Sequence, residues 1–76
     1  IHMPPNAYRI NLNEANAATL AHSFKGIGMK RAEAIVKFRK LHGHFKAVED
    51  IGRVKGIGMA FVQRNLEALY NTYAIR

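Results

Sequence analysis

The sequence predicts a small all-α domain, and three observations lead to this fold class. A six-residue pattern, apolar-Lys-Gly-Ile-Gly-Met, occurs at residues 24–29 and again 30 residues later at 54–59. Apolar residues recur with helical spacing around both copies, and no stretch of four or more residues alternates convincingly between apolar and polar side chains. At 76 residues the chain suffices for one domain with a small core. We therefore expect about five helices, built from one supersecondary unit used twice and related by a pseudo-two-fold axis.

The expected domain spans residues 10–73, with a first motif at about 17–42 and a second at about 47–71. The segment Ile1-His2-Met3 is typical of a cloning scar, and the prolines after it predict an extended lead-in. Residues 1–9 are therefore set apart from the domain. The stretch from Tyr8 to Leu12 comes closest to strand-like alternation and predicts a short extended arm.

A helix is expected before the first glycine pair, because four apolar residues share one helical face. These residues are Ala17, Leu20, Ala21 and Phe24. Asn16 is the expected N-cap, and Asn13-Glu14 offers an alternative start one turn earlier.

The helix after the first glycine pair has a wide apolar arc and ends at Gly43, a residue suited to the backbone conformation of a helix C-terminus. The arc consists of Ala32, Ile35, Val36, Phe38 and Leu41. Residues 48–52 are long enough for one or two helical turns. After the second glycine pair, one apolar stripe predicts a single helix that contains Met59, Val62, Leu66, Leu69 and Tyr73.

The composition restricts the classes of function. With 49% hydrophobic and 22% charged residues, the chain is expected to fold rather than act as a disordered basic tail. The absence of cysteine excludes a disulfide scaffold, a Cys-ligated zinc site and thiol catalysis. No apolar run approaches the ~18 residues that a membrane span needs. A net charge of +7 and a pI of about 10.3 favour a polyanionic partner, either nucleic acid or an anionic membrane surface.

The two Gly-Ile-Gly turns are candidate phosphate sites. Their glycines permit positive φ, and the isoleucine between them can point inward and anchor the turn. The helix that follows presents free N–H groups and the positive end of its dipole to an anion. A plain helix–helix connector is the alternative for a single copy, but lysines near a helix N-terminus oppose the dipole and are not needed for stability. The candidate cations are Lys25, Lys30 and Arg31 at the first turn and Lys55 at the second.

The combined pattern resembles the tandem helix-hairpin-helix domain of ComEA-like competence proteins over about residues 10–70. The segments that carry the resemblance are Ile10-Asn11-Leu12-Asn13-Glu14-Ala15, the two Lys-Gly-Ile-Gly turns, Ala32-Glu33-Ala34-Ile35-Val36 and Gly43-His44-Phe45-Lys46-Ala47-Val48-Glu49-Asp50-Ile51. In this family the hairpins donate backbone N–H groups to phosphates on both sides of the DNA minor groove. The resemblance implies that role for Gly26, Ile27, Gly28, Met29 and Lys30, and for Gly56, Ile57, Gly58, Met59 and Ala60.

The resemblance implies sequence-independent binding of double-stranded DNA through its phosphate backbone, for DNA uptake in natural transformation. It also implies a periplasmic protein whose signal peptide has been removed, with other DNA-uptake machinery as a candidate partner. Two alternatives remain open: an accessory DNA-binding domain of a repair or processing enzyme, and a helix-hairpin-helix protein-interaction module.

Three departures from the family pattern matter. Lys25 replaces a proline that often precedes Gly-Ile-Gly, and Ala47 replaces a serine N-cap, so the short third helix is expected to fray. Ala60 and Phe61 stand where the first motif has Lys30 and Arg31, which predicts a larger contribution from the first hairpin.

Other candidate residues favour structural roles. His42 and His44 lack a further ligand at suitable spacing, so neither a metal nor another cofactor is expected. The acidic pair Glu49-Asp50 is expected to form a salt bridge to Arg39 or Arg53. The tyrosines are expected to be packing or rim residues; they are Tyr8, Tyr70 and Tyr73. Because no carboxylate cluster or Ser-His arrangement occurs, the sequence predicts a binding module and not an enzyme.

Overall fold

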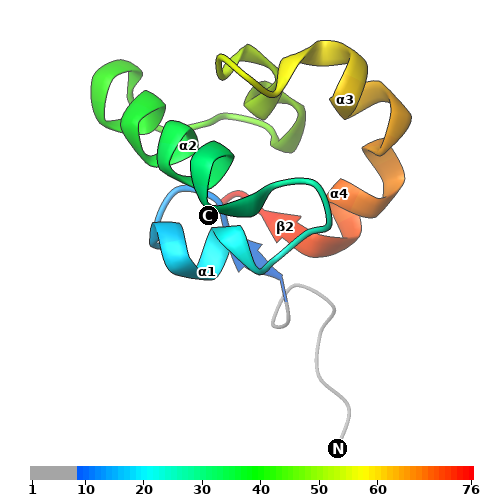
Figure 1. Ribbon diagram of the computed structural model, residues 1–76, viewed down its shortest axis with the longest axis horizontal. Coiled ribbons are helices and arrows are strands. Elements are labelled where there is room, and N and C mark those ends of the chain that lie inside the picture. Colours follow the sequence, from blue (N-terminus) through cyan, green and yellow to red (C-terminus); the bar gives the residue numbers. More distant parts are fainter. Residues whose placement is uncertain (1–8) are drawn as a thin grey trace, which may run out of the picture.

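The computed structural model describes residues 9–76 as a mostly helical domain with a minimal parallel sheet (Figure 1). In chain order the elements are β1 (Ile10–Asn11), α1 (Ala17–Ala21), α2 (Gly28–His42), the 3-10 helix η2 (Val48–Arg53), α3 (Gly58–Arg64), α4 (Leu66–Thr72) and β2 (Tyr73–Ala74). The all-α fold with about five helices is confirmed. The expected arm is extended at Ile10–Asn11, whereas Tyr8 and the lead-in lie outside the described residues.

The two strands join the beginning and the end of the domain. Ile10 is paired with Tyr73 and Asn11 with Ala74, in parallel. Leu12 continues this ladder, because its N–H donates to the carbonyl oxygen of Ala74 at 3.1 Å. The sequence did not predict β2, since Tyr73 has helical spacing from Leu69; in the structure α4 ends at Thr72.

The hydrophobic core lies between the two motifs, with α1 packed on α2 and η2 packed on α3. Side chains from every helix contribute to it. Its fully buried members include Leu12, Leu20, Ile35, Ile51, Val62, Leu69 and Tyr73. Burial of such apolar side chains is the main source of stability in a domain of this size.

The first helix begins where Asn16 caps it. The Asn16 side-chain oxygen accepts a hydrogen bond from the Thr19 N–H at 2.8 Å, as expected of an N-cap. The alternative start at Asn13 is wrong, because the Asn13 amide is buried and bonded to Phe45: Nδ2 donates to the Phe45 carbonyl at 3.1 Å, and Oδ1 accepts from its N–H at 2.7 Å. Asn13 therefore fastens the connector after α2 to the N-terminal turn.

The expected single helix after the second glycine pair is divided at Asn65. This residue has φ −125° and ψ 17°, and its side-chain amide donates to the Phe61 carbonyl at 2.8 Å. An asparagine that bonds to nearby backbone competes with regular helical bonding. The break redirects the chain, so Leu69 is buried whereas Leu66 is 40% exposed.

Two other apolar residues lie outside the expected helical faces. Phe24 follows the end of α1 and packs edge-on against Phe61, with ring centroids 6.1 Å apart. Leu41 was expected on the buried arc of α2 but is 70% exposed. The last turn of α2 lies at the edge of the molecule (Figure 1), and Leu41 lines a surface cleft with Phe38 and Val54.

The expected salt bridge between the acidic pair and an arginine is wrong for the described residues. Arg39 donates to the Leu12 carbonyl at 2.9 Å, and the Arg53 guanidinium lies 5.6 Å from the centre of the Phe38 ring. Glu49 accepts a hydrogen bond from the Tyr70 hydroxyl, which lowers the pKa of Glu49 and raises that of Tyr70.

Asp50 takes over the capping that Ala47 cannot provide. Its Oδ2 accepts hydrogen bonds from the N–H groups of Lys46 and Ala47, both at 3.1 Å. A carboxylate at this end of a helix also interacts favourably with the dipole. The short helix η2 is therefore anchored where fraying was expected, and it buries Val48 and Ile51.

Candidate nucleic-acid interface

The two Gly-Ile-Gly turns adopt the same backbone conformation. Hairpin one (residues 25–28) and hairpin two (residues 55–58) each place both glycines at positive φ: 102° at Gly26, 59° at Gly28, 98° at Gly56 and 79° at Gly58. In each hairpin the isoleucine N–H donates to the carbonyl three residues earlier, at 3.1 Å for Ile27 and 3.0 Å for Ile57. Both isoleucine side chains point into the core and are 2% and 7% exposed, respectively. The expected inward anchors are therefore present.

A helix begins directly at each hairpin, α2 at Gly28 and α3 at Gly58. Neither helix has a side-chain cap or an acidic residue in its first turn. The first N–H groups of a helix have no acceptor within the helix, and the dipole makes this end positive. Both hairpins thus combine glycines at positive φ with helix starts that contain no acidic residue in the first turn.

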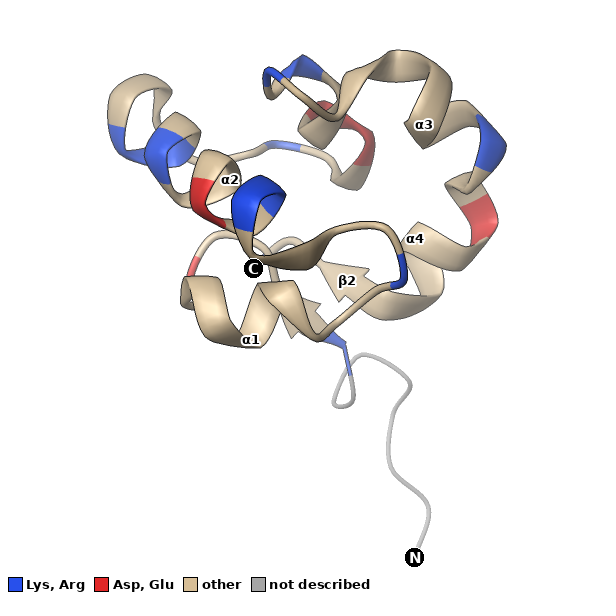
Figure 2. Ribbon diagram, viewed as in Figure 1, with Lys and Arg blue, Asp and Glu red and all other residues tan. Residues whose placement is uncertain are grey.

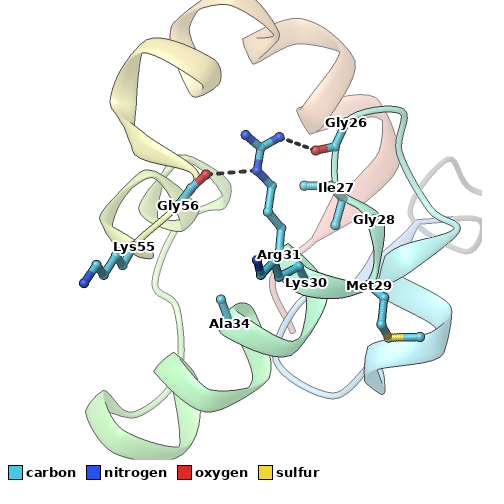
Figure 3. A pocket seen from close by; sticks show the side chains of 9 residues that line it. All are labelled: Gly26, Ile27, Gly28, Met29, Lys30, Arg31, Ala34, Lys55 and Gly56. Atoms are coloured by element: carbon cyan, nitrogen blue, oxygen red, sulfur yellow. Dashed lines mark hydrogen bonds between the residues drawn. The ribbon is translucent and has the colours of Figure 1, made fainter.

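Both hairpins line one open groove of about 730 Å³, the inter-hairpin groove (Figure 3). Its lining residues are Gly26, Ile27, Gly28, Met29, Lys30, Arg31, Ala34, Lys55 and Gly56. The groove contains all of the expected site at hairpin one except Lys25, but only Lys55 and Gly56 from hairpin two. The other expected residues, Ile57, Gly58, Met59 and Ala60, lie outside its lining.

Cationic side chains surround this groove. Lys30 is exposed in the first turn of α2, and Lys55 is exposed just before the second glycine pair. Figure 3 shows the Lys55 side chain directed outward from hairpin two. Lys and Arg occur along α2 and at the turn that leads into α3 (Figure 2). The groove is therefore a concave, positively charged surface, suited to an anionic ligand.

Arg31 lies between the two hairpins and bonds to both. Its Nε donates to the Gly56 carbonyl at 2.9 Å, and its Nη1 donates to the Gly26 carbonyl (Figure 3). Its guanidinium carbon lies 5.5 Å from the centre of the Phe61 ring. Sequence reasoning treated Arg31 as a phosphate ligand and gave Phe61 no role. The sequence did contain a signal for the contact between these two side chains. Arg31 and Phe61 occupy equivalent positions in the two copies of the repeat, so they can face each other where the copies pack together.

Residues 9–76 contain no group of three His, Cys, Asp or Glu side chains that could hold a metal ion. His42 packs beside Phe38, with ring centroids 4.5 Å apart. Within the same residues, none of the helices is long and apolar enough to cross a membrane.

The sequence matches the family model described as the helix-hairpin-helix motif over residues 5–69. An uncharacterized protein of Haemophilus influenzae is 41% identical over 61 residues, which cover 80% of this chain and 54% of that protein. Human endonuclease/exonuclease/phosphatase family domain-containing protein 1 is 45% identical over 60 residues, 79% of this chain and 10% of that protein. ComE operon protein 1 of Bacillus subtilis is 41% identical over 49 residues, 64% of this chain and 23% of that protein.

The chain thus spans about half of the Haemophilus relative and about a tenth of the human one. The expected resemblance to ComEA-like competence proteins is confirmed by the family match and by the similarity to the Bacillus protein. This chain belongs to the helix-hairpin-helix motif family, with a domain of the ComEA-like type.

Proposed function

We propose that this domain binds double-stranded DNA through its phosphate backbone, without preference for sequence. The observation that carries the proposal is the inter-hairpin groove, where two glycine turns, a helix start and exposed lysines come together. Backbone N–H groups at a helix start and lysine side chains are the donors that phosphate oxygens accept in protein–DNA complexes. Membership of the helix-hairpin-helix family supports the same ligand.

Hairpin one supplies most of the binding surface in this proposal. The groove contains residues 26–31 of the first motif, including Lys30, whereas Ala60 occupies the equivalent position after hairpin two. Contacts of this kind neutralise phosphates and fix the protein on the duplex, but they read no base edges. Affinity is therefore expected to depend on salt and hardly on sequence.

The biological role that we propose is DNA uptake during natural transformation, by a binding module and not an enzyme, in the periplasm. Similarity to ComE operon protein 1 supports this role. An accessory DNA-binding domain within a longer enzyme is the second candidate, and it is favoured by the human relative, of which the matched region covers only 10%.

Binding assays with unrelated duplexes of equal length test the ligand class. We expect fluorescence anisotropy titrations to give dissociation constants that agree within a few-fold for all duplexes. A tenfold preference for one sequence would contradict backbone recognition. Failure to bind any plain duplex would support the protein-interaction alternative instead.

A domain exchange tests the biological role. The matched region of ComE operon protein 1 is replaced by residues 9–76 of this chain, and transformation frequency is measured in Bacillus subtilis. We expect the hybrid to transform, whereas a hybrid carrying Lys30→Ala and Lys55→Ala should transform less often at equal protein level. A hybrid that binds duplex DNA but never transforms would favour the accessory-domain candidate.

A further inference from the structure

We infer that Arg31 is a positioning residue that holds the two hairpins at a fixed separation and so favours duplex DNA over single-stranded DNA. This inference rests on the proposed DNA binding. It differs from the sequence-based expectation, in which the Arg31 side chain contacts phosphate directly. The observations that carry it are the two hydrogen bonds from one guanidinium to carbonyl groups of different hairpins.

The geometry of these bonds constrains both hairpins at once. Gly26 and Gly56 are 30 residues apart in sequence and occupy equivalent positions of the repeat, yet both carbonyl oxygens face Arg31. A guanidinium is planar, and its donors have fixed directions, so bonding to both carbonyls sets their separation as well as their orientation. Arg31 therefore connects the two hairpins as a rigid clamp.

Aromatic side chains support the clamp from the protein side. The guanidinium lies over Phe61, and Phe61 in turn meets Phe24 edge to face, with ring centroids 6.1 Å apart. Arginine stacks favourably on aromatic rings, and this contact limits the freedom of a long side chain. Phe61 is thus the surface against which Arg31 is held.

The clamp also changes what an anion meets in the groove. Gly26 and Gly56 both line it, and a carbonyl oxygen is the negative end of a peptide dipole that repels phosphate. Donation from Arg31 covers these oxygens and places a positive charge between the hairpins. The groove is therefore already suited to bind a phosphate group in the absence of DNA.

Fixed separation affects the two forms of DNA differently. The phosphates of a duplex stand at set positions, so a protein whose two sites already match them loses little conformational freedom on binding. A single strand is flexible and can adjust its phosphates to hairpins that are not aligned. Loss of the clamp should then weaken duplex binding more than single-strand binding.

The test compares Arg31→Lys with wild type and with Lys30→Ala. Lysine keeps the positive charge of residue 31 but is a point charge without a planar fork. We expect Arg31→Lys to lower affinity for duplex DNA about tenfold and for single-stranded DNA less than about twofold, because pre-organisation is lost and charge is not. The slope of log K against log salt for Arg31→Lys with duplex DNA should match that of wild type. Lys30→Ala should weaken binding to both forms and flatten the slope of log K against log salt by about one.

Residual dipolar couplings of the hairpin amide groups, measured without DNA, report the clamp directly. We expect Arg31→Lys to change the relative orientation of the hairpins, while Lys30→Ala leaves it unchanged. Wild-type affinity and couplings in Arg31→Lys would overturn the inference.

If circular dichroism shows that Arg31→Lys is unfolded, Phe61→Leu is used instead. It should also lower the preference for duplex, and an unchanged preference would overturn the inference. If wild type binds no DNA, the proposed function fails, while the couplings still decide whether Arg31 clamps the hairpins.

Discussion

Ile27 and Ile57 are the residues on which the two hairpins depend. Both are buried, at 2% and 7% exposure, and each N–H closes its own turn. We predict that Ile27→Ala and Ile57→Ala each lower the free energy of unfolding by about 2–5 kcal/mol, because truncation leaves a cavity in a packed core. Urea unfolding followed by circular dichroism measures this change. Met29→Ala is the control: Met29 is 47% exposed, and surface changes of this kind stay within about 0.5 kcal/mol. Equal effects of Ile27→Ala and Met29→Ala would contradict the anchoring role.

Tyr73 makes the stability of the domain sensitive to alkaline pH. Burial raises the pKa of its hydroxyl, and a hydrogen bond with the Ser23 hydroxyl lowers it by a smaller amount. The unfolded tyrosine ionises near pH 10, below the folded pKa, so above about pH 10 the folded state binds the extra proton. Stability is therefore complete below about pH 10 and falls as the pH rises through the folded pKa.

We predict that Tyr73→Phe reduces this alkaline loss. At pH 7 the free energy of unfolding of the variant should be about 1 kcal/mol lower than that of wild type, because the bond to Ser23 is missing. Between pH 8 and pH 11 this free energy should fall less in the variant than in wild type. Thermal unfolding at each pH measures the difference, because the two proteins differ at residue 73 alone. Parallel curves for the two proteins would show that ionisation of Tyr73 is not linked to folding.

The sequence allowed some of these residue roles to be predicted and not others. The anchoring isoleucines follow from a local rule, since a residue between two turn glycines must point either inward or to solvent. The role of Arg31 depends on where hairpin two lies, and tertiary packing alone brings Gly56 within reach of its side chain. Charge and position in the helix predicted a cation at the groove but not the groups that it binds.

Among the elements, the connector between α2 and η2 depends on Asn13. The Asn13 side chain satisfies both the N–H and the carbonyl of Phe45, and the residue is only 7% exposed. We predict that Asn13→Ala destabilises the domain by about 1–3 kcal/mol for each buried group left without a partner. Urea unfolding measures the total loss of unfolding free energy, and faster hydrogen exchange at the Phe45 amide shows that the loss arises at this connector. Asn71→Ala, at an exposed position of α4, should change neither. An unprotected Phe45 amide in wild type would be inconsistent with this bond.

Helix positions were more predictable than helix ends. Helical periodicity identified α1 and α2, and the N-cap at Asn16 followed from residue type. The break at Asn65 was missed because Val62, Leu69 and Tyr73 keep a spacing that suits one continuous helix. Exposure of Leu41 was missed because periodicity identifies a helical face but not how far the core extends along it.

At the scale of the whole molecule, which carries a net charge of +7, cationic side chains from both motifs line one groove. Lys30 and Lys55 come from different motifs but line the same groove. Repetition of the hairpin therefore does more than duplicate a site. It brings two cationic turns to one surface, while the core residues of both motifs pack together behind them.

Salt dependence of duplex binding tests this view of the surface. Three lysines lie at the hairpins, namely Lys25, Lys30 and Lys55, whereas Arg31 is bonded to the hairpin carbonyls. Each phosphate neutralised in B-DNA contributes about −0.9 to the slope of log K against log salt, so we predict a slope of about −3. Titrations at several salt concentrations measure it, and a flat response would show that the cationic groove is not where DNA binds.

Single variants divide that slope between the hairpins. Lys30→Ala and Lys55→Ala should each flatten it by about one, and the double variant by about two, because each removes one phosphate contact. Lys40→Ala is the matched control, since Lys40 is exposed on the same helix as Lys30 but does not line the groove. All four variants should melt like wild type, because their side chains lie outside the core. If Lys40→Ala flattens the slope as much as Lys30→Ala, the charge of the molecule acts as a diffuse field, and the groove has no special part in binding.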